Sequence, residues 1–462
     1  MHLVLLCGGA GKRLWPTSNE LRSKLFVELL PSPDDGVGRE SMLGRVCRQL
    51  AQANLLDSTL LISHQSQTNL ATRHSKGLIP VIGEPFKRGT FTAAALATLY
   101  LQSRRGLGEE DIICIAPADV FAGDDFFASF KLLPDLLKAA KSDIALIGTT
   151  PTHASDQYGY ILPDVHERTG YMSLARFLEK PDIHLAETLL QRKALWNCGV
   201  YAFSTNFMLS HMKKAGIPAN FDDLLRIYEQ LPERSFDKQV AEQAQQAVVL
   251  PYPGLWRDIG SWEALSDLLD SNVYGNGSIS GHSPGSHIVN ELPYPVHVIG
   301  VPGIIAAASP DGILIAHKKT SNDIKAQMGD MPKQPMYGEA TWGNFQVIDR
   351  FPGDGNTTVL TVKLTVFPGK HIGLRNHRSG YKAWTVLAGS GQVLLKGRLF
   401  EVAAGEQFSI ASQGTYSILA ETGMEIMEVR SEDDPFNPDG ISYETYDWKD
   451  IVKRVKSRKT PE

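Results

Sequence analysis

Residues 2–13, HLVLLCGGAGKR, place a short continuous apolar run directly before a glycine-rich loop. This combination is typical of a buried parallel strand whose carboxyl end opens into a tight turn. Downstream, apolar residues recur at Met42, Val46 and Leu50, and the pattern predicts strands at 58–63, 111–116 and 143–148 and helices at 91–102 and 124–140. We therefore predict a three-layer, Rossmann-like α/β domain over residues 1–270, built around a mostly parallel sheet.

The pattern changes after this domain. Glycine, serine, asparagine and proline separate short apolar runs, which predicts a small β extension at 271–325. Residues 326–340, AQMGDMPKQPMYGEA, have no periodicity and are expected to form a linker. Strand-like runs joined by glycine turns follow over 341–431 and predict a separate all-β barrel. We expect the lysine- and arginine-rich tail, 432–462, to be a solvated terminus.

Composition and charge narrow the range of functions. The chain has 462 residues, of which 42% are hydrophobic and 21% charged, and its formal net charge is −5. These values are typical of folded globular domains, and the acidic balance provides no basic field for a nucleic acid. The four cysteines form no C-x-x-C pair, and no apolar stretch reaches the roughly 20 residues that span a bilayer. We therefore expect a cytoplasmic protein that binds neither nucleic acid nor membrane.

The glycine loop after the first apolar run has the features of a phosphate site. Residues without a Cβ let successive backbone N–H groups turn toward an anion, and Lys12, Arg13 and Lys24 add positive charge beside the turn. The Walker A loop and the dinucleotide fingerprint are both excluded, because the required glycine and hydroxyl positions hold other residues. The residues expected to bind a nucleoside triphosphate are Gly8, Gly9, Ala10, Gly11, Lys12, Arg13 and Lys24.

Several motifs in a fixed order carry a resemblance to a known family. The loop and its continuation, LCGGAGKRLWPTSNELRSKLF at 6–26, resemble the signature of the sugar-1-phosphate nucleotidyltransferases, and the Leu-Trp-Pro core is most similar to the mannose-1-phosphate guanylyltransferases. The other motifs are PAD at 117–119, YGYI at 158–161, FLEKP at 177–181, WNCGVYAF at 196–203 and RDIGSW at 257–262, followed by NELPYP and DGILIAHKK. The resemblance therefore extends over the α/β domain and the β extension.

Two aspartates are candidate metal ligands. Asp119 follows the strand-like run DIICIAPA and Asp258 follows AVVLPYPGLW, so both are expected at the edge where open α/β sheets bind ligands. Either residue alone could be a helix cap or a turn residue. As a pair beside a triphosphate loop they would make an oxygen-ligand site suited to Mg²⁺. The resemblance assigns this role to both, and it implies Mg²⁺ as the cofactor.

The resemblance also implies a sugar-phosphate subsite. Lys180 would be the cation for the sugar-1-phosphate and Glu179 an acceptor for sugar hydroxyls, although without the resemblance they would be a surface pair in a turn closed by Pro181. Asn197 would bind sugar hydroxyls, and Gly159 would let the sugar approach the backbone. The catalytic residues implied for nucleotidyl transfer are Arg13, Lys24, Asp119, Lys180 and Asp258.

The sequence departs from the family pattern in two places. Ser23 and Lys24 stand where many relatives have Pro-Lys, which keeps the positive charge but loosens the turn. Residues 89–94 read GTFTAA where many relatives have Gly-Arg-Asn-Thr-Ala-Pro, in a segment that lies near the nucleotide. The second departure leaves the base open between guanine and another base.

The predicted barrel resembles the cupin domain that relatives carry as a mannose-6-phosphate isomerase, a metal enzyme. Aligned on Trp384, the family's His-His-His-Arg-Ala-Glu-His-Trp becomes HRSGYKAW, in which His377 alone is kept. Arg378 and Lys382 would repel a divalent metal, and Tyr416 occupies the position of a further histidine. We expect this barrel to be metal-free and without isomerase activity.

Together these observations predict a Mg²⁺-dependent enzyme that makes GDP-mannose from GTP and mannose-1-phosphate, assembled as a homo-oligomer such as a dimer. Two alternatives stay open. The same chemistry could act on another sugar-1-phosphate, such as a manno-heptose, or on another nucleotide. In a different class, the chain could be a catalytically silent nucleotide-sugar-sensing or regulatory subunit, although the five implied catalytic residues are all present.

Overall fold

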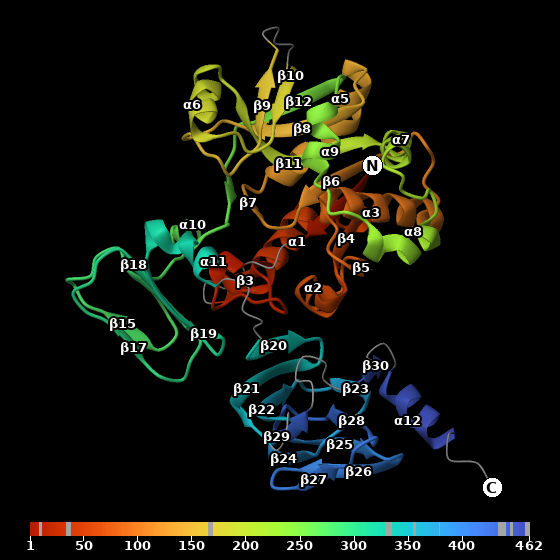
Figure 1. The fold of residues 1–462 in the computed structure, drawn as a ribbon, viewed down its shortest axis with the longest axis vertical. Helices are drawn as coiled ribbons and strands as arrows, with labels where there is room; N and C mark the ends of the chain where they lie inside the picture. The colour runs from red at the N-terminus through yellow and green to blue at the C-terminus, as the bar shows by residue number, and fades with distance from the viewer. Residues whose placement is uncertain are drawn as a thin grey trace. The chain divides into compact units, whose positions relative to one another are not determined.

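The computed structural model of the chain describes residues 1–8, 12–33, 38–164, 170–328, 335–353, 357–377, 379–432, 440–443 and 447–457. It divides into two compact units (Figure 1). The first comprises Met1–Gly11 and Ser23–Asp270, and the second comprises Lys12–Arg22 and Ser271–Glu462. The chain therefore enters the second unit briefly after its first strand and then returns to the first unit.

A nine-stranded sheet forms the centre of the first unit. Its strands, in spatial order, are β5 (Val81–Glu84), β4 (Thr59–His64), β1 (His2–Cys7), β6 (Ile112–Pro117), β11 (Leu195–Ser204), β8 (Ile144–Thr149), β12 (Ala247–Tyr252), β10 (Met172–Leu178) and β9 (Tyr160–Pro163). The four strands from β5 to β6 run parallel, as do β8 and β12. In contrast, β11 runs antiparallel to both of its neighbours, and so does β10. The sheet is therefore mixed, which corrects the expectation of a mostly parallel one.

The first unit also contains the helices. They are α1 (Met42–Gln52), α2 (Thr68–His74), α3 (Gly89–Arg105), α4 (Phe126–Ser129), α5 (Leu133–Ala140), α6 (Ile183–Gln191), α7 (Thr205–Lys214), α8 (Phe221–Ile227), α9 (Phe236–Gln239) and α10 (Trp262–Ser266). Helices α3, α7 and α8 pack on one face, in a core that contains Val4. Leu3 and Leu5 are fully buried and point to the opposite face, because side chains alternate along a strand. Both faces are covered, as the predicted three-layer architecture requires.

One predicted helix differs from the structure. Residues 124–140 form α4, the short 3₁₀ helix η5 (Phe130–Leu132) and α5 in place of a single helix. Pro134 lies at the start of α5 and cannot donate a backbone hydrogen bond to the preceding turn, so a new helix begins there.

Short strands and 3₁₀ turns complete the first unit. The strands are β2 (Glu28–Pro31), β3 (Arg39–Ser41), β7 (Val120–Ala122) and β13 (Trp256–Asp258). The 3₁₀ turns are η2 (Lys24–Phe26), η3 (Leu56–Ser58), η4 (Gln65–Gln67), η6 (Tyr228–Gln230) and η7 (Ala241–Gln243). Two pairs of these strands, β2 with β3 and β7 with β13, run antiparallel outside the main sheet.

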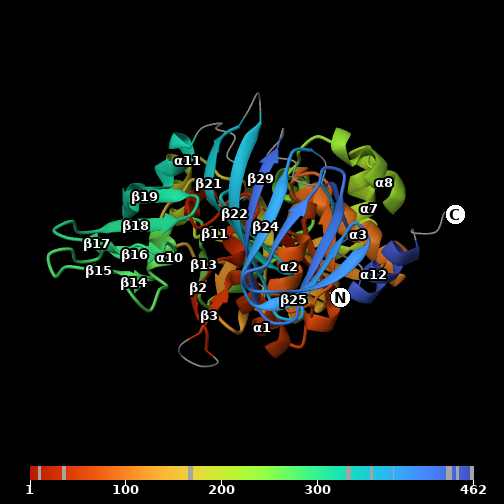
Figure 2. The ribbon, with the colours of Figure 1, turned by 90° about the horizontal axis from the view of Figure 1, so that it is seen from below.

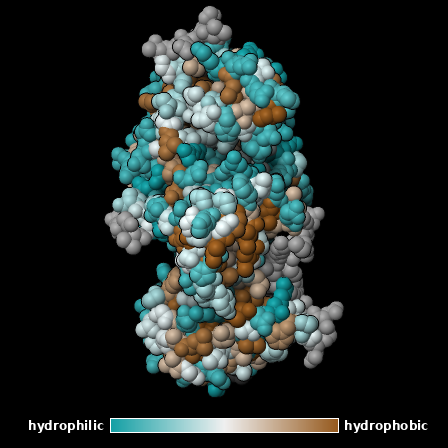
Figure 3. Space-filling model, turned by 90° about the vertical axis from the view of Figure 1, so that its left-hand side faces the viewer, coloured by the Kyte–Doolittle hydropathy of each residue, from teal (hydrophilic) through white to brown (hydrophobic). Residues whose placement is uncertain are grey.

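The β extension forms the first part of the second unit after residue 270. One sheet contains β14 (Val273–Tyr274), β16 (His287–Asn290), β18 (Ile304–Ser309) and β19 (Gly312–His317), and a second pairs β15 (Gly277–Ile279) with β17 (Val296–Val298). The turn η8 (Lys318–Asp323) and helix α11 (Ile324–Gln327) follow. Apolar side chains gather on the surface of this extension (Figure 3). Ile299, Ile313 and Ile315 belong to it and are 74%, 61% and 70% exposed.

Two facing sheets form the barrel. The six-stranded sheet contains, in spatial order, β20 (Tyr337–Ala340), β21 (Gly343–Pro352), β22 (Thr358–Val366), β29 (Met424–Glu432), β24 (Lys382–Ala388) and β27 (Gln407–Ile410). Strands β21, β22, β29 and β24 can be followed side by side in Figure 2. The five-stranded sheet contains β26 (Arg398–Ala403), β25 (Ser390–Leu395), β28 (Thr415–Ala420), β23 (His371–Asn376) and β30 (Gly440–Tyr443). Strand β20 lies inside the segment that was expected to be a linker. The barrel sheet therefore begins earlier than the sequence predicts.

The tail also contains more structure than expected. Helix α12 (Trp448–Ser457) packs Trp448 and Ile451 against Leu394 of the barrel, and both of these helix side chains are buried. Lys449 and Lys453 lie on its exposed side, so the charges are solvated, as expected, while the helix itself is docked. Within the described part of the chain, no helix combines the length and apolar character that crossing a bilayer requires.

Candidate active site

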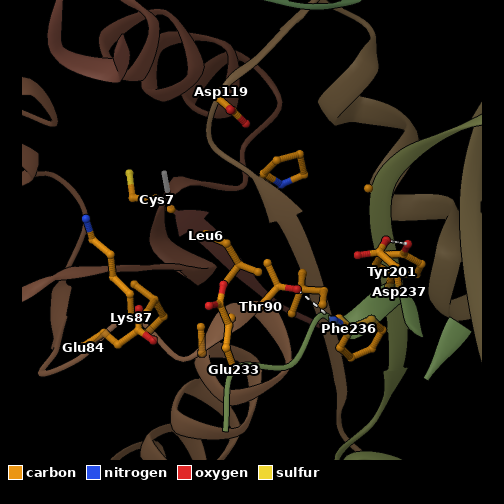
Figure 4. Close-up of a pocket in the computed structure, with 17 residues that line it drawn as sticks. Leu6, Cys7, Glu84, Lys87, Thr90, Asp119, Tyr201, Glu233, Phe236 and Asp237 are labelled. Atoms are coloured by element: carbon orange, nitrogen blue, oxygen red, sulfur yellow. Dashed lines mark hydrogen bonds between the residues drawn. The ribbon is translucent and has the colours of Figure 1, made fainter. Parts of the chain in front are cut away.

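A cavity of about 480 Å³ opens at the carboxyl ends of the parallel strands in the first unit (Figure 4). Strand β1 lies between β4 and β6, with Cys7 opposite Ser63 and Leu6 opposite Pro117, so the three strands end at the same edge. Gly8, which follows β1, and Asp119, which follows β6, both line the cavity. Two of the predicted site residues therefore meet at one cavity because parallel strands end together.

Asp119, Asp258 and Lys24 form a charged cluster beside this cavity. Strand β7 pairs with β13 so that Asp258 lies opposite Val120, which brings Asp258 next to Asp119. Lys24 begins η2, and its Nζ lies 2.7 Å from Asp119 Oδ2 and 3.5 Å from Asp258 Oδ1. The ammonium also donates a hydrogen bond of 3.1 Å to the carbonyl oxygen of Ile259. The structure thus brings together three residues that lie far apart in the sequence.

The charge of Lys24 is stabilised by this arrangement. Burial alone would lower the pKa of Lys24, but the carboxylates of Asp119 and Asp258 outweigh it and raise the pKa above its ordinary value. The side chain is 16% exposed, so the ammonium is held as a fixed positive charge between two negative ones. Such a charge needs no reorganisation when an anionic substrate arrives.

The donor set of the same cluster fits a hard divalent cation. Oxygens of Asp119 and Asp258 converge on one position, at which the Lys24 ammonium already acts as the cation. Within the described residues, no group of three or more His, Cys, Asp or Glu side chains is arranged to hold a metal. Two carboxylates are enough for Mg²⁺ where phosphate oxygens and water supply the remaining ligands.

A second cluster contains the predicted sugar-binding residues. A Cβ added at Gly159 would lie 2.8 Å from Glu179 Oε2 and 3.4 Å from the Cβ of Asn197. The backbone N–H of Asn197 donates to the carbonyl oxygen of Gly159 at 2.8 Å, because β9 and β11 pair at this point. A side chain at position 159 would therefore displace the Glu179 carboxylate from its place beside Asn197.

Lys180 completes this cluster at the surface. Its Nζ lies 2.9 Å from Glu179 Oε1, and its side chain is 58% exposed. Burial raises the pKa of Glu179, and Asp237 raises it further, while Lys180 partly offsets both effects. Glu179 is therefore a carboxyl group whose charge depends on its cationic neighbour.

Two residues that sequence reasoning missed link this cluster to the cavity. Asn197 Nδ2 donates to the Tyr201 hydroxyl at 2.6 Å and lies 3.3 Å from Asp237 Oδ1. The Tyr201 hydroxyl donates in turn to Asp237 Oδ1 at 2.5 Å, and both residues line the cavity (Figure 4). Tyr201 lies inside the WNCGVYAF motif and could have been found there. Asp237 has no such signal.

The opposite side of the cavity is also polar. Glu84, Lys87 and Thr90 line it close to the start of α3. Glu84 accepts hydrogen bonds from the Tyr228 hydroxyl at 2.9 Å and from the backbone N–H of Arg88, and burial raises its pKa. Thr90 lies within the departure at 89–94, and Glu84 and Lys87 precede it; sequence reasoning named neither Glu84 nor Lys87.

Other predicted residues cannot be assigned to this site from the structure. Gly9, Ala10 and Gly11 lie outside the described residues, as does the side chain of Lys12. Arg13 lies in η1 (Lys12–Leu14), which belongs to the second unit. Its role in binding a triphosphate stays a prediction.

The barrel interior contains a buried charged cluster at the aligned cupin positions. The side chain of Lys382 is fully buried, with Nζ 2.8 Å from the Tyr416 hydroxyl and 3.6 Å from Glu428 Oε2. Trp384 Nε1 donates to the same Glu428 oxygen at 2.6 Å. His377, which precedes Lys382 in the sequence, is also buried. Arg378 lies outside the described residues. The two aligned residues that replace expected ligands thus contact each other inside the barrel.

Comparisons with known proteins agree with this arrangement. The sequence pattern of the nucleotidyl transferase family matches residues 2–272. The chain is 26% identical to mannose-1-phosphate guanylyltransferase RfbM of Salmonella typhimurium and 27% identical to alginate biosynthesis protein AlgA of Pseudomonas aeruginosa, with 93% of each protein covered in both cases. A solved structure described as mannose-1-phosphate geranyltransferase from Thermus thermophilus superposes with a TM-score of 0.61 at 25% identity, over 72% of this chain and 99% of that one.

Proposed function

Because the chain belongs to the nucleotidyl transferase family, we propose that it transfers GMP from GTP to mannose-1-phosphate, releasing pyrophosphate and forming GDP-mannose. The observation that carries the choice of substrates is the match to proteins named mannose-1-phosphate guanylyltransferase over 93% of both chains. The cluster of Lys24, Asp119 and Asp258 beside the cavity supports the chemistry.

In the proposed reaction, a phosphate oxygen of mannose-1-phosphate attacks the α-phosphorus of GTP in line, and the bond to the β-phosphate bridging oxygen breaks. The attacking oxygen is already anionic near neutral pH, so no protein nucleophile is needed. The chain must hold two anions together and neutralise the charge of the transferring group. Lys24 supplies a fixed positive charge for this, and Arg13 is expected to supply another. Asp119 and Asp258 would hold Mg²⁺, whose chemistry is to neutralise phosphate charge.

We assign the sugar phosphate to the second cluster. Lys180 is exposed enough to exchange its Glu179 partner for a phosphate group, and this exchange would leave Glu179 free to accept from sugar hydroxyls. Asn197 offers an amide to the sugar, held in place by Tyr201 and Asp237. These roles are our proposal for the subsite, and they rest on the contacts around Gly159.

The base would occupy the side of the cavity near α3. Guanine presents N–H donors along one edge, which a carboxylate such as Glu84 or Glu233 could accept. The altered segment at 89–94 lies on this side of the cavity, so a base other than guanine is the alternative. The experiment below distinguishes the two.

We further propose that catalysis belongs to residues 1–270 and that the barrel, predicted at 341–431 but beginning with β20 at Tyr337, has no isomerase activity. The buried Lys382 supports the second point, because an ammonium inside the barrel opposes a divalent metal. We propose a cytoplasmic homo-oligomer, since all four cysteines are unpaired and the β extension exposes apolar side chains.

The test is pyrophosphate release by the purified chain, measured for each of the four nucleoside triphosphates with mannose-1-phosphate, glucose-1-phosphate and a manno-heptose-1-phosphate. We expect GTP with mannose-1-phosphate to be preferred, and Asp258→Ala to abolish release. Preference for another sugar phosphate or nucleoside triphosphate would show that the chain catalyses the same reaction on that substrate. No release with any pair, from a folded chain in Mg²⁺, would favour the silent sensing subunit.

A further inference from the structure

The segment Lys12–Arg22, which carries Arg13, is anchored by residues far along the chain in the second unit. Asn19 Nδ2 donates to Asp311 Oδ2 at 2.6 Å and to the carbonyl oxygen of Tyr337 at 2.9 Å. Asn19 Oδ1 accepts from the backbone N–H groups of Leu21 and Arg22. One side chain thus shapes the segment from within and attaches it to two other elements.

Arg22 makes a second attachment through its charge. Its guanidinium lies 2.9 Å and 3.0 Å from the two carboxylate oxygens of Glu291, and its Nε lies 3.0 Å from Glu339 Oε1. The guanidinium also lies over the ring of Tyr337, 5.3 Å from its centroid. The side chains of Arg22 and Glu339 are 10% and 7% exposed, so solvent screens this pair little.

Close packing supports these polar contacts. A Cβ added at Gly312 would lie 2.5 Å from Cζ2 of Trp15, and one added at Gly338 would lie 3.2 Å from Cδ1 of Leu21. Glycine at 312 is therefore needed for Trp15 to lie where it does, whereas Gly338 makes room first for the Phe345 ring of the barrel and only then for Leu21. The segment is held along its length and not only at one end.

The anchoring elements belong to two different sheets. Asp311 connects β18 to β19 of the β extension, and it also accepts from the backbone N–H of Met336. Tyr337 and Glu339 lie on β20, the edge strand of the six-stranded barrel sheet, where β20 pairs with β21. A displacement of the barrel edge would therefore act directly on Asn19 and Arg22.

We propose that β20 of the barrel, through Glu339 and Tyr337, is a positioning element for Lys12–Arg22, here called the signature segment. By holding this segment, β20 sets the affinity of the catalytic site for its nucleoside triphosphate. This inference rests on the proposed function for its kinetic part. It assigns a role to a barrel in which His377 is the one aligned metal ligand that is kept. Glu339 and Arg22 are positioning residues here, because they act through the segment and not on the substrate.

The first test compares two charge-removing variants of the same barrel. Glu339→Gln removes the anchoring charge, while Glu425→Gln removes one partner of the surface pair between Lys363 and Glu425, in which both side chains are more than a third exposed. Amide hydrogen exchange of residues 12–22 is measured on the free chain. We expect exchange to rise about fivefold in Glu339→Gln, the factor for about 1 kcal/mol of local stability, and to stay unchanged in Glu425→Gln.

The second test separates positioning from general destabilisation. In Glu339→Gln we expect the KM for GTP to rise by up to about fivefold, the limit set by the same loss of local stability, while the KM for mannose-1-phosphate and kcat change by less than about twofold. Glu339→Asp should recover part of the loss. The double variant Arg22→Met, Glu339→Gln should raise the KM for GTP no more than Arg22→Met alone does, because the two substitutions remove the same ion pair. If Arg22→Met does not fold, Asn19→Ala replaces it.

The outcomes distinguish this inference from the proposed function. Unchanged exchange at 12–22 in folded Glu339→Gln, or equal effects on both substrates, would overturn the inference. If the wild-type chain turned over no sugar phosphate, the proposed function would fail. The exchange result, together with GTP affinity measured by calorimetry, would then still decide whether β20 positions the segment.

Discussion

Replacing Lys24 with methionine tests whether the ammonium holds two carboxylates together. Lys24 Nζ lies 2.7 Å from Asp119 and 3.5 Å from Asp258, and methionine keeps the length of the chain without the charge. The variant leaves both carboxylates facing a position that no longer contains a cation. We expect lower stability, a strong response to Mg²⁺ and a loss of nucleotidyl transfer.

The size of the effect follows from the geometry. At an effective dielectric constant of about 20, unit charges at these two distances attract by roughly 6 and 5 kcal/mol. Desolvation of the ammonium cancels most of this, and solvent screens Asp258, which is 39% exposed. We expect a net loss of about 2 kcal/mol, which corresponds to a fall of roughly 4–8 °C in Tm for a unit of this size. Since the pKa of Lys24 is raised, its contribution is complete below the unfolded pKa of about 10.4 and is lost only as the pH rises through the folded value.

The assay is thermal unfolding at about pH 7.5, with and without Mg²⁺, of the wild type, Lys24→Met and the control Lys363→Met. Lys363 belongs to an exposed barrel pair, so its loss should change Tm little. In Lys24→Met the two carboxylates are available to the metal, and Mg²⁺ at about 100 times its Kd would return roughly 2.7 kcal/mol. The wild type should gain less, because its ammonium competes for the same oxygens.

Two results would refute this reasoning. A Lys24→Met chain that melts within about 1 °C of the wild type would show that the cluster contributes no net stability. A Mg²⁺ response no larger than that of the wild type would show that the carboxylates do not form a cation site. Turnover should also fall by about 10²- to 10³-fold, since one preorganised charge is lost.

Three further predictions address other parts of the chain. Lys180→Ala should raise the KM for mannose-1-phosphate more than that for GTP, and steady-state kinetics showing equal effects would contradict separate anion subsites. Because burial raises the pKa of Glu84, its stabilising contribution is present below the unfolded pKa of about 4.3 and lost as the pH rises through the folded value, so urea unfolding should show Glu84→Gln gaining stability relative to the wild type between about pH 4 and pH 7. The full chain should bind no stoichiometric Zn²⁺, Mn²⁺ or Co²⁺ in the barrel and should not interconvert mannose-6-phosphate and fructose-6-phosphate; elemental analysis of an Asp119→Ala, Asp258→Ala chain, with an isomerase assay, checks both.

The positions of the strand ends could be predicted from the sequence. Contacts between side chains that lie far apart in the sequence could not. Gly8 and Asp119 follow short apolar runs, and parallel strands end at one edge, so their proximity follows from the pattern alone. The approach of Asp258 depends on the pairing of β7 with β13, two strands of three residues that no periodicity reveals. The apolar run before Asp258 placed it at this edge of the sheet, but its contact with Asp119 and Lys24 could not be predicted from that run.

The missed residues share one cause. Asp237 lies 40 positions from Asn197 in the chain, and Tyr228 lies 144 positions from Glu84. No local spacing connects such residues, because the contact is made by packing of α9 and η6 against the sheet. The antiparallel direction of β11 was missed for a similar reason, since an apolar run indicates burial but not strand direction.

In the barrel, the sequence alone identified residues that contact each other in the fold. The sequence alone shows that Lys382 and Tyr416 replace expected ligands, and the structure adds that they contact each other at 2.8 Å. The docking of α12 was not expected, although Trp448 and Ile451 are apolar residues three positions apart, as on one face of a helix.

The anchoring of the signature segment has a consequence for biosynthesis. Asn19 and the Tyr337 carbonyl that it contacts are 318 residues apart, and ribosomes add roughly 5–20 residues per second. About 15 to 65 s therefore pass between the synthesis of the segment and that of its final anchor. During this interval the first unit can fold while the segment still lacks its contacts with β20. A ribosome stalled before residue 337 should thus display residues 12–22 to a protease, and one stalled after residue 366, with β21 and β22 emerged, should protect them.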